Sequence, residues 1–92
     1  MLHFRHPDLK GAYAHVAAGG QALFVRRVLH HGRPVGWLID DDVTRLYNTA
    51  RRLGVRSVRI LRGGRVGQCV DLQGTPFEKA LAEVGQKELA LS

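Results

Sequence analysis

Residues 23–39 read LFVRRVLHHGRPVGWLI, and this stretch decides the fold. It holds two apolar runs, Leu23–Leu29 and Val35–Ile39, on either side of a polar segment that contains a glycine and a proline. Short apolar runs bounded by turn residues are typical of β-strands. Histidine, glycine and proline between them are typical of a turn. The stretch therefore predicts two strands joined by a turn at His30–Pro34, with the second strand largely buried.

The residues before this stretch show the same short pattern. Runs at Leu2–His6 and Ala12–Ala17 are β-like, and each is followed by turn-forming residues, Pro7-Asp8 and Gly19-Gly20. Such runs separated by turn residues predict two more strands. We expect the N-terminal part of the chain to form antiparallel hairpins.

The residues after this stretch carry a helical period. Apolar side chains recur at helical spacing at Val43, Leu46, Tyr47, Ala50 and Leu53. An aspartate at position 41 or 42 can cap the start and Gly54 can close the end, so we predict a helix near residues 42–53. Its opposite side faces solvent or a partner and carries Arg45, Asn48, Thr49 and Arg52.

Two further strands and a second helix complete the pattern. Val55–Leu61 and Val66–Leu72 are predicted strands, joined by a tight turn at Arg62–Arg65 whose adjacent glycines supply positive φ angles. A capping box then starts a helix, because Thr75 as the N-cap is followed three residues later by a glutamate. Gly85 is expected to end that helix and leave a short tail.

The elements together predict a single small α/β domain of the α+β type over residues 1–92. We expect a mostly antiparallel sheet of hairpins with two helices, in the order ββββ-α-ββ-α. A chain of 92 residues allows one modest core. Hydrophobic residues at 45% and charged residues at 24% are ordinary for a globular protein and exclude a disordered chain.

Targeting and cysteine signals narrow the class further. The chain has no apolar signal segment and no apolar run of about 18 residues, so we expect a cytoplasmic protein with no membrane partner. Cys69 is the only cysteine, which excludes an internal disulfide scaffold and a thiolate zinc finger. A lone cysteine in a strand is most simply a small buried side chain.

The order of these features resembles a small bacterial and phage domain of unknown function that is marked by a His-Tyr-Asp motif. The likeness covers roughly the last two-thirds of the chain and runs from Phe24-Val25 through Trp37-Leu38 to Glu88-Leu89. Where that family would place its motif, this chain has Cys69-Val70-Asp71, so only Asp71 is carried over. The resemblance implies an α/β fold and no function.

The net charge of +6 is carried mainly by arginine. The segment from Val43 to Val70 contains seven arginines and no acidic residue. A guanidinium grips phosphate with two hydrogen bonds, and nucleic acid is the commonest polyanion, so this segment favours nucleic-acid or phosphate binding. The alternative is a basic surface that reflects only an arginine-rich composition. The predicted contact residues are Arg45, Arg52, Arg59, Arg62 and Arg65.

Three other features have a functional and a structural interpretation. Asp40–Asp42 could hold magnesium, or cap the predicted helix. His30 and His31 could bind a metal or act as a base, or simply occupy the turn. Trp37 could be a core residue, or an exposed platform on which a base stacks.

Three hypotheses about function follow. The first is a noncatalytic module that binds DNA, RNA or phosphate and needs no cofactor. The second is a protein-interaction module that pairs with a second copy or an acidic partner through an exposed sheet edge or face. The third is a metal-dependent nuclease that uses Asp40–Asp42, Asp71 and His30 or His31 in one cleft. The sequence favours a protein that is not an enzyme.

Overall fold

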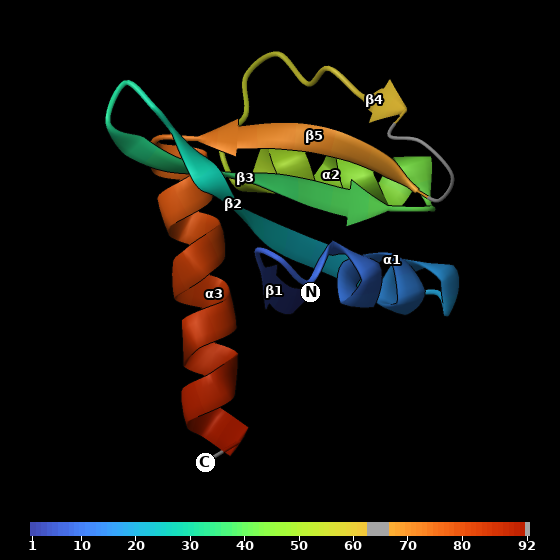
Figure 1. Ribbon diagram of the computed structural model, residues 1–92. Coiled ribbons are helices and arrows are strands. Elements are labelled where there is room, and N and C mark those ends of the chain that lie inside the picture. The colour runs from blue at the N-terminus through green and yellow to red at the C-terminus, as the bar shows by residue number, and fades with distance from the viewer. Residues whose placement is uncertain (63–66, 92) are drawn as a thin grey trace.

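The computed structural model describes residues 1–62 and 67–91, with all their side chains except those of residues 28, 62 and 86–91. The described residues form three helices and a mixed five-stranded sheet in the order β1-β2-β3-β5-β4 (Figure 1). The predicted α+β class is confirmed. Along the chain the elements are β1 (Leu2–Arg5), α1 (Leu9–Ala17), β2 (Gln21–His30), β3 (Arg33–Asp40), α2 (Val43–Arg52), β4 (Leu61–Arg62), β5 (Gln68–Gln73) and α3 (Thr75–Leu91).

The predicted β2–β3 hairpin is the centre of the sheet. Its turn residues His31 and Gly32 have φ angles of 51° and 74°. Two positive φ angles are what a type I′ turn requires, and this turn matches the twist of the strands it joins. β3 also pairs antiparallel with β5, while β1 pairs parallel with β2. Parallel neighbours need a crossover connection, and α1 supplies it.

The run Ala12–Ala17, predicted as a strand, is part of helix α1 instead. Its buried residues Ala12 and Val16 lie four apart, which is helical and not strand spacing. The Asp8 side chain accepts a hydrogen bond from the Gly11 amide at 3.0 Å and so caps the helix. The chain therefore begins β-α-β-β, with one helix more than predicted.

Three predicted boundaries also differ from the structure. Of the predicted strand Val55–Leu61, only Leu61 is in β4, and Val55, Val58 and Ile60 pack without a strand partner against the core. Helix α3 begins at Thr75 itself, because the Gly74 carbonyl accepts from the Glu78 amide at 3.0 Å. It continues past Gly85, the predicted end, to Leu91. The predicted turn at 62–65 falls mostly outside the described residues.

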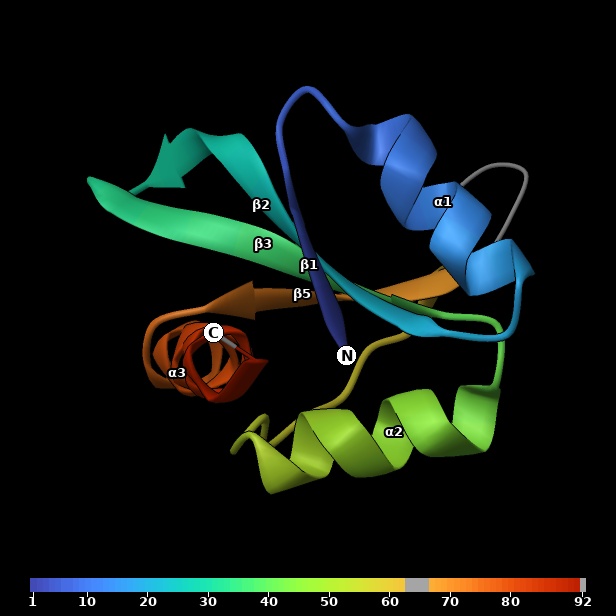
Figure 2. The ribbon, with the colours of Figure 1, turned by 90° about the horizontal axis from the view of Figure 1, so that it is seen from below.

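The sheet separates two hydrophobic clusters. Helix α1 covers one face and α2 and α3 cover the other (Figure 2). The alternation along β2 produces this, since Ala22 and Phe24 point toward α1 while Leu23 points toward α2 and α3. Among the described residues, no helix has the length and apolarity that a membrane crossing needs.

Candidate functional site

The α1 face of the sheet is covered over only part of its length. Ala22, Phe24, Ile39 and Cys69 are buried beneath α1. Further along the same three strands Trp37 and Arg26 are half-buried, and Asp71 is exposed. Figure 2 shows the β2–β3 hairpin reaching past α1. We call this uncovered region, with the hairpin end, the open face; it consists of Arg26, His30, Arg33, Trp37, Asp71 and Gln73.

Trp37 is the centre of the open face. It lies opposite Phe24 in the β2–β3 register, and their ring centroids are 5.8 Å apart with planes 29° from parallel. The Cζ atom of Arg26 is 4.5 Å from the centroid of the Trp37 ring, which is cation–π distance. Of the two interpretations of Trp37, the structure supports parts of both: Phe24 anchors the ring, and the ring remains half-exposed.

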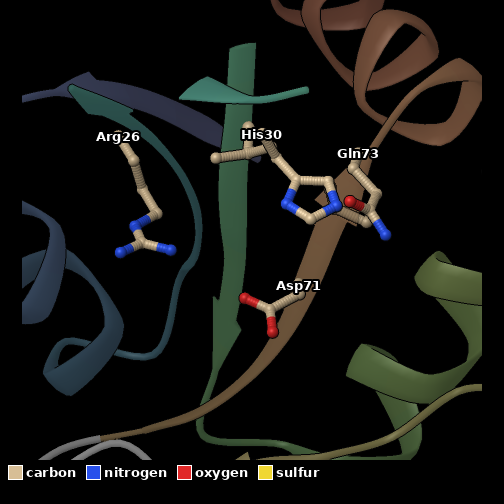
Figure 3. Close-up of a pocket in the computed structure, with 6 residues that line it drawn as sticks. Arg26, His30, Asp71 and Gln73 are labelled. Carbon is tan, nitrogen blue, oxygen red and sulfur yellow. The ribbon is translucent and has the colours of Figure 1, made fainter. Parts of the chain in front are cut away.

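Beside this stack lies a shallow hollow of about 240 Å³. Arg26 and His30 from β2 and Asp71 and Gln73 from β5 line it, and the ring of His30 lies next to Gln73 while Arg26 lies apart from them (Figure 3). Asp71 lies opposite Trp37 in the β3–β5 register. In the described part of the chain no ion pair joins Arg26 to Asp71. The hollow therefore offers the guanidinium of Arg26, the imidazole of His30, the amide of Gln73 and one carboxylate.

Arg45, the first of the predicted phosphate contacts, is held by a buried carboxylate. Its Nε and Nη2 atoms donate to the Asp40 carboxylate at 2.6 and 2.7 Å, and Nη2 also donates to the Gly19 carbonyl at 3.0 Å. Asp40 is fully buried and also accepts from Gln21 at 2.9 Å and from the Asp42 amide at 2.9 Å. Arg45 thus joins the start of α2 to the end of α1.

The other predicted arginines lie apart from Arg45. Arg52 forms an ion pair with Glu83 of α3. It sits seven residues from Arg45 along α2, which is about 10 Å of helix. Arg59 is exposed and has no described partner. Arg62 lies in β4 with its side chain outside the described set, and Arg65 lies outside the described residues. The structure does not gather the five arginines at one point.

The acidic residues of the nuclease hypothesis are not together either. Asp42 caps α2 by accepting from the Arg45 amide at 3.1 Å, and Asp40 is occupied as described. No group of three or more histidine, cysteine, aspartate or glutamate side chains placed to hold a metal occurs in the part of the chain that the structure describes. Of the hypothetical set, His30 and Asp71 share the hollow.

Cys69 lies beneath α1, as a small buried side chain. Burial raises the pKa of its thiol, and the carboxylate of Asp71 raises it further. A thiol with a raised pKa is a poor nucleophile at neutral pH. In the segment Cys69-Val70-Asp71, the cysteine is therefore a core residue, and Asp71 is part of the open face.

Comparisons with known proteins add no relatives. The chain matches no protein-family model, no curated protein and no solved structure. The resemblance to the His-Tyr-Asp domain stays a prediction from the sequence, and function is argued from the geometry of the open face.

Proposed function

We propose that this protein binds single-stranded nucleic acid through the open face. The observation that carries this proposal is the guanidinium of Arg26 over the half-exposed ring of Trp37, 4.5 Å from its centroid, on an uncovered part of the sheet. Nucleobases stack on aromatic rings and on arginine planes alike, at about 1–3 kcal/mol per base. A base that lies beside this pair meets both kinds of surface.

Charge and size support a strand lying along the surface. Arg33 and His30, at the hairpin end, are exposed beside the stack and can contact the phosphates that flank a stacked base. The hollow of about 240 Å³ is below the roughly 300–1,000 Å³ of pockets that enclose small ligands. A second hollow of about 530 Å³ at the hairpin end has no apolar side chain in its lining, which consists of His30, His31, Arg33, Gln73 and Gly74. A single strand exposes the faces of its bases and a duplex hides them, so the proposal favours the single strand.

Fluorescence anisotropy with labelled single- and double-stranded DNA and RNA at several salt concentrations tests this proposal. We expect single strands to bind more tightly than duplexes, and the affinity to fall steeply with salt. The double variant Arg26→Gln, Arg33→Gln should weaken binding at least tenfold. It should also reduce the slope of log affinity against log salt by about 0.7, since Arg33 is the phosphate contact that is lost and one contact contributes about 0.7 on single strands.

A variant with the same charge, Arg56→Gln, Arg59→Gln, provides the matched control. Both residues are exposed, and their side chains have no described partner. Its affinity should fall much less than that of the open-face variant. Equal losses in the two variants would show that only net charge matters, and a larger loss in the control would favour the arginines of residues 56–65. Flat signals for every nucleic acid would direct the search to a protein partner.

A further inference from the structure

A second concave surface opens on the side of the sheet that faces α3, where strand β1 stops. β1 pairs with β2 as far as Arg5, opposite Val25, and the His6 amide donates to the Val25 carbonyl at 3.0 Å. Beyond that point β2 has no neighbour on the β1 side and is paired with β3 alone up to the hairpin turn. The resulting groove encloses about 520 Å³. It is lined by Arg5, His6, Val25, Arg26, Arg27, Pro34, Phe77 and Leu81.

The floor and the rim of this groove differ in chemistry. Phe77, Leu81, Val25 and Pro34 form an apolar floor. Phe77 is 2% exposed and Leu81, one helical turn further along α3, is half-buried, so the floor is continuous with the core. The rim carries Arg5, Arg27 and His6, and none of the lining residues is acidic. Arg26 also lines the groove, but its guanidinium lies over the Trp37 ring.

We propose that this groove binds a free small molecule that has an apolar body and one anionic end group. Its volume lies within the roughly 300–1,000 Å³ of small-ligand pockets. An apolar body on Phe77 and Leu81 removes hydrocarbon from water, and a carboxylate, sulfonate or phosphate at the rim meets Arg5 and Arg27 in a forked geometry that guanidinium favours.

This site is separate from the open face. Arg26 lines both surfaces, but Trp37, Arg33 and Asp71 do not line the groove, and Arg27, Phe77 and Leu81 do not line the hollow. A different substitution on the open face, Trp37→Ala, should therefore leave ligand binding in the groove unchanged. An experiment can therefore contradict one of the two proposals and leave the other intact.

Titration with anilinonaphthalene sulfonate, whose emission rises in an apolar environment, tests the groove. We expect saturable binding of one molecule per protein. Decanoate should displace it at least tenfold better than decanol, because decanol has the same chain without the charge. Arg27→Gln should weaken the binding of decanoate about fivefold, and Leu81→Ala should weaken the binding of both competitors.

Arg56→Gln is the matched control, because it removes an exposed guanidinium that does not line the groove. Circular dichroism establishes that each variant is folded. Equal displacement by decanoate and decanol, or equal weakening by Arg27→Gln and Arg56→Gln, would overturn the proposal. Decanoate binding that appears only when it is part of a lipid vesicle would overturn it too, since the ligand would then be a membrane surface.

Discussion

Asp40 is a candidate functional residue in the sequence, but in the structure its carboxylate stabilises the fold. Burial raises the pKa of its carboxyl, but hydrogen bonds from Arg45, the Asp42 amide and Gln21 outweigh burial and hold the pKa below its usual range. A carboxyl with a lowered folded-state pKa stabilises the protein at neutral pH. That contribution is lost as the pH falls below about 4, through the lowered pKa.

Arg45→Gln should lower the free energy of unfolding by about 2 kcal/mol near neutral pH, because it leaves Asp40 buried without its cation. The loss is smaller than for a fully buried pair, since the Arg45 side chain is 44% exposed. The difference between wild type and variant should shrink in acid, where Asp40 is protonated and the pair no longer exists. Urea denaturation across the pH range measures it. A difference that stays constant with pH would contradict the assignment.

Asp71 is the one acidic side chain of the open face, and it opposes phosphate binding there. Asp71→Asn should raise the affinity for single-stranded DNA about two- to fivefold, since repulsion between exposed charges is worth up to about 1 kcal/mol. Asp41→Asn removes the same charge from an exposed residue at the other end of β3 and should have a smaller effect. Anisotropy titrations compare the two. Equal gains would mean that the nucleic acid does not lie against Asp71.

At the scale of elements, the close packing of helix α3 against the sheet depends on a glycine in β3. A Cβ atom at Gly36 of β3 would lie 2.7 Å from the Phe77 ring and 2.8 Å from the Phe24 carbonyl oxygen. Gly36→Ala should therefore destabilise the protein by about 1–3 kcal/mol through overpacking. Gly85→Ala is the control, because Gly85 lies within α3 with open space around it. It should stabilise by about 0.5–1 kcal/mol. Thermal unfolding separates the two, and destabilisation by both would contradict this packing.

The hairpin shows what the sequence could and could not predict about these elements. The strands and the turn were predictable, because apolar runs flank glycine and proline. The pairing of His30 with Arg33, extended without interruption, would place Trp37 opposite Arg26. An irregularity between Val25 and Leu29 shifts the register, and Trp37 lies opposite Phe24 instead. Such a bulge depends on packing in three dimensions, so local sequence patterns do not reveal it.

Helix α1 was missed for a related reason. Its buried residues Ala12 and Val16 are small and few, so the helical period was weak in a short segment. The Asp8 cap was the available signal. The apolar pattern of α2 is longer and more regular, so it predicted the bounds of this helix within a residue or so. The capping residues at both ends and the arginine-rich outer face are consistent with the same bounds.

At the scale of the whole molecule, the distribution of charge differs from the linear pattern of arginines. The segment richest in arginine contains Arg45 and Arg52, whose side chains are paired with Asp40 and Glu83 from other parts of the chain. Glu83 is 31 residues from Arg52 along the chain, so that pairing was not predictable from local composition. Asp40 is only five residues from Arg45, but as a candidate metal ligand or cap it was not expected to pair with Arg45. Trp37 was identified as a stacking candidate, but its contact with Arg26 required the folded sheet.

The fluorescence of Trp37 tests the central proposal most directly, because the chain contains only this tryptophan. Unlabelled single-stranded oligonucleotide is added while the emission of the protein is recorded, and anisotropy of a labelled strand is followed in parallel. We predict a saturable change in Trp37 emission at the same concentrations as the anisotropy change, with both transitions weakened together by salt. Binding by anisotropy with unchanged Trp37 emission, or no binding at all, would contradict the account.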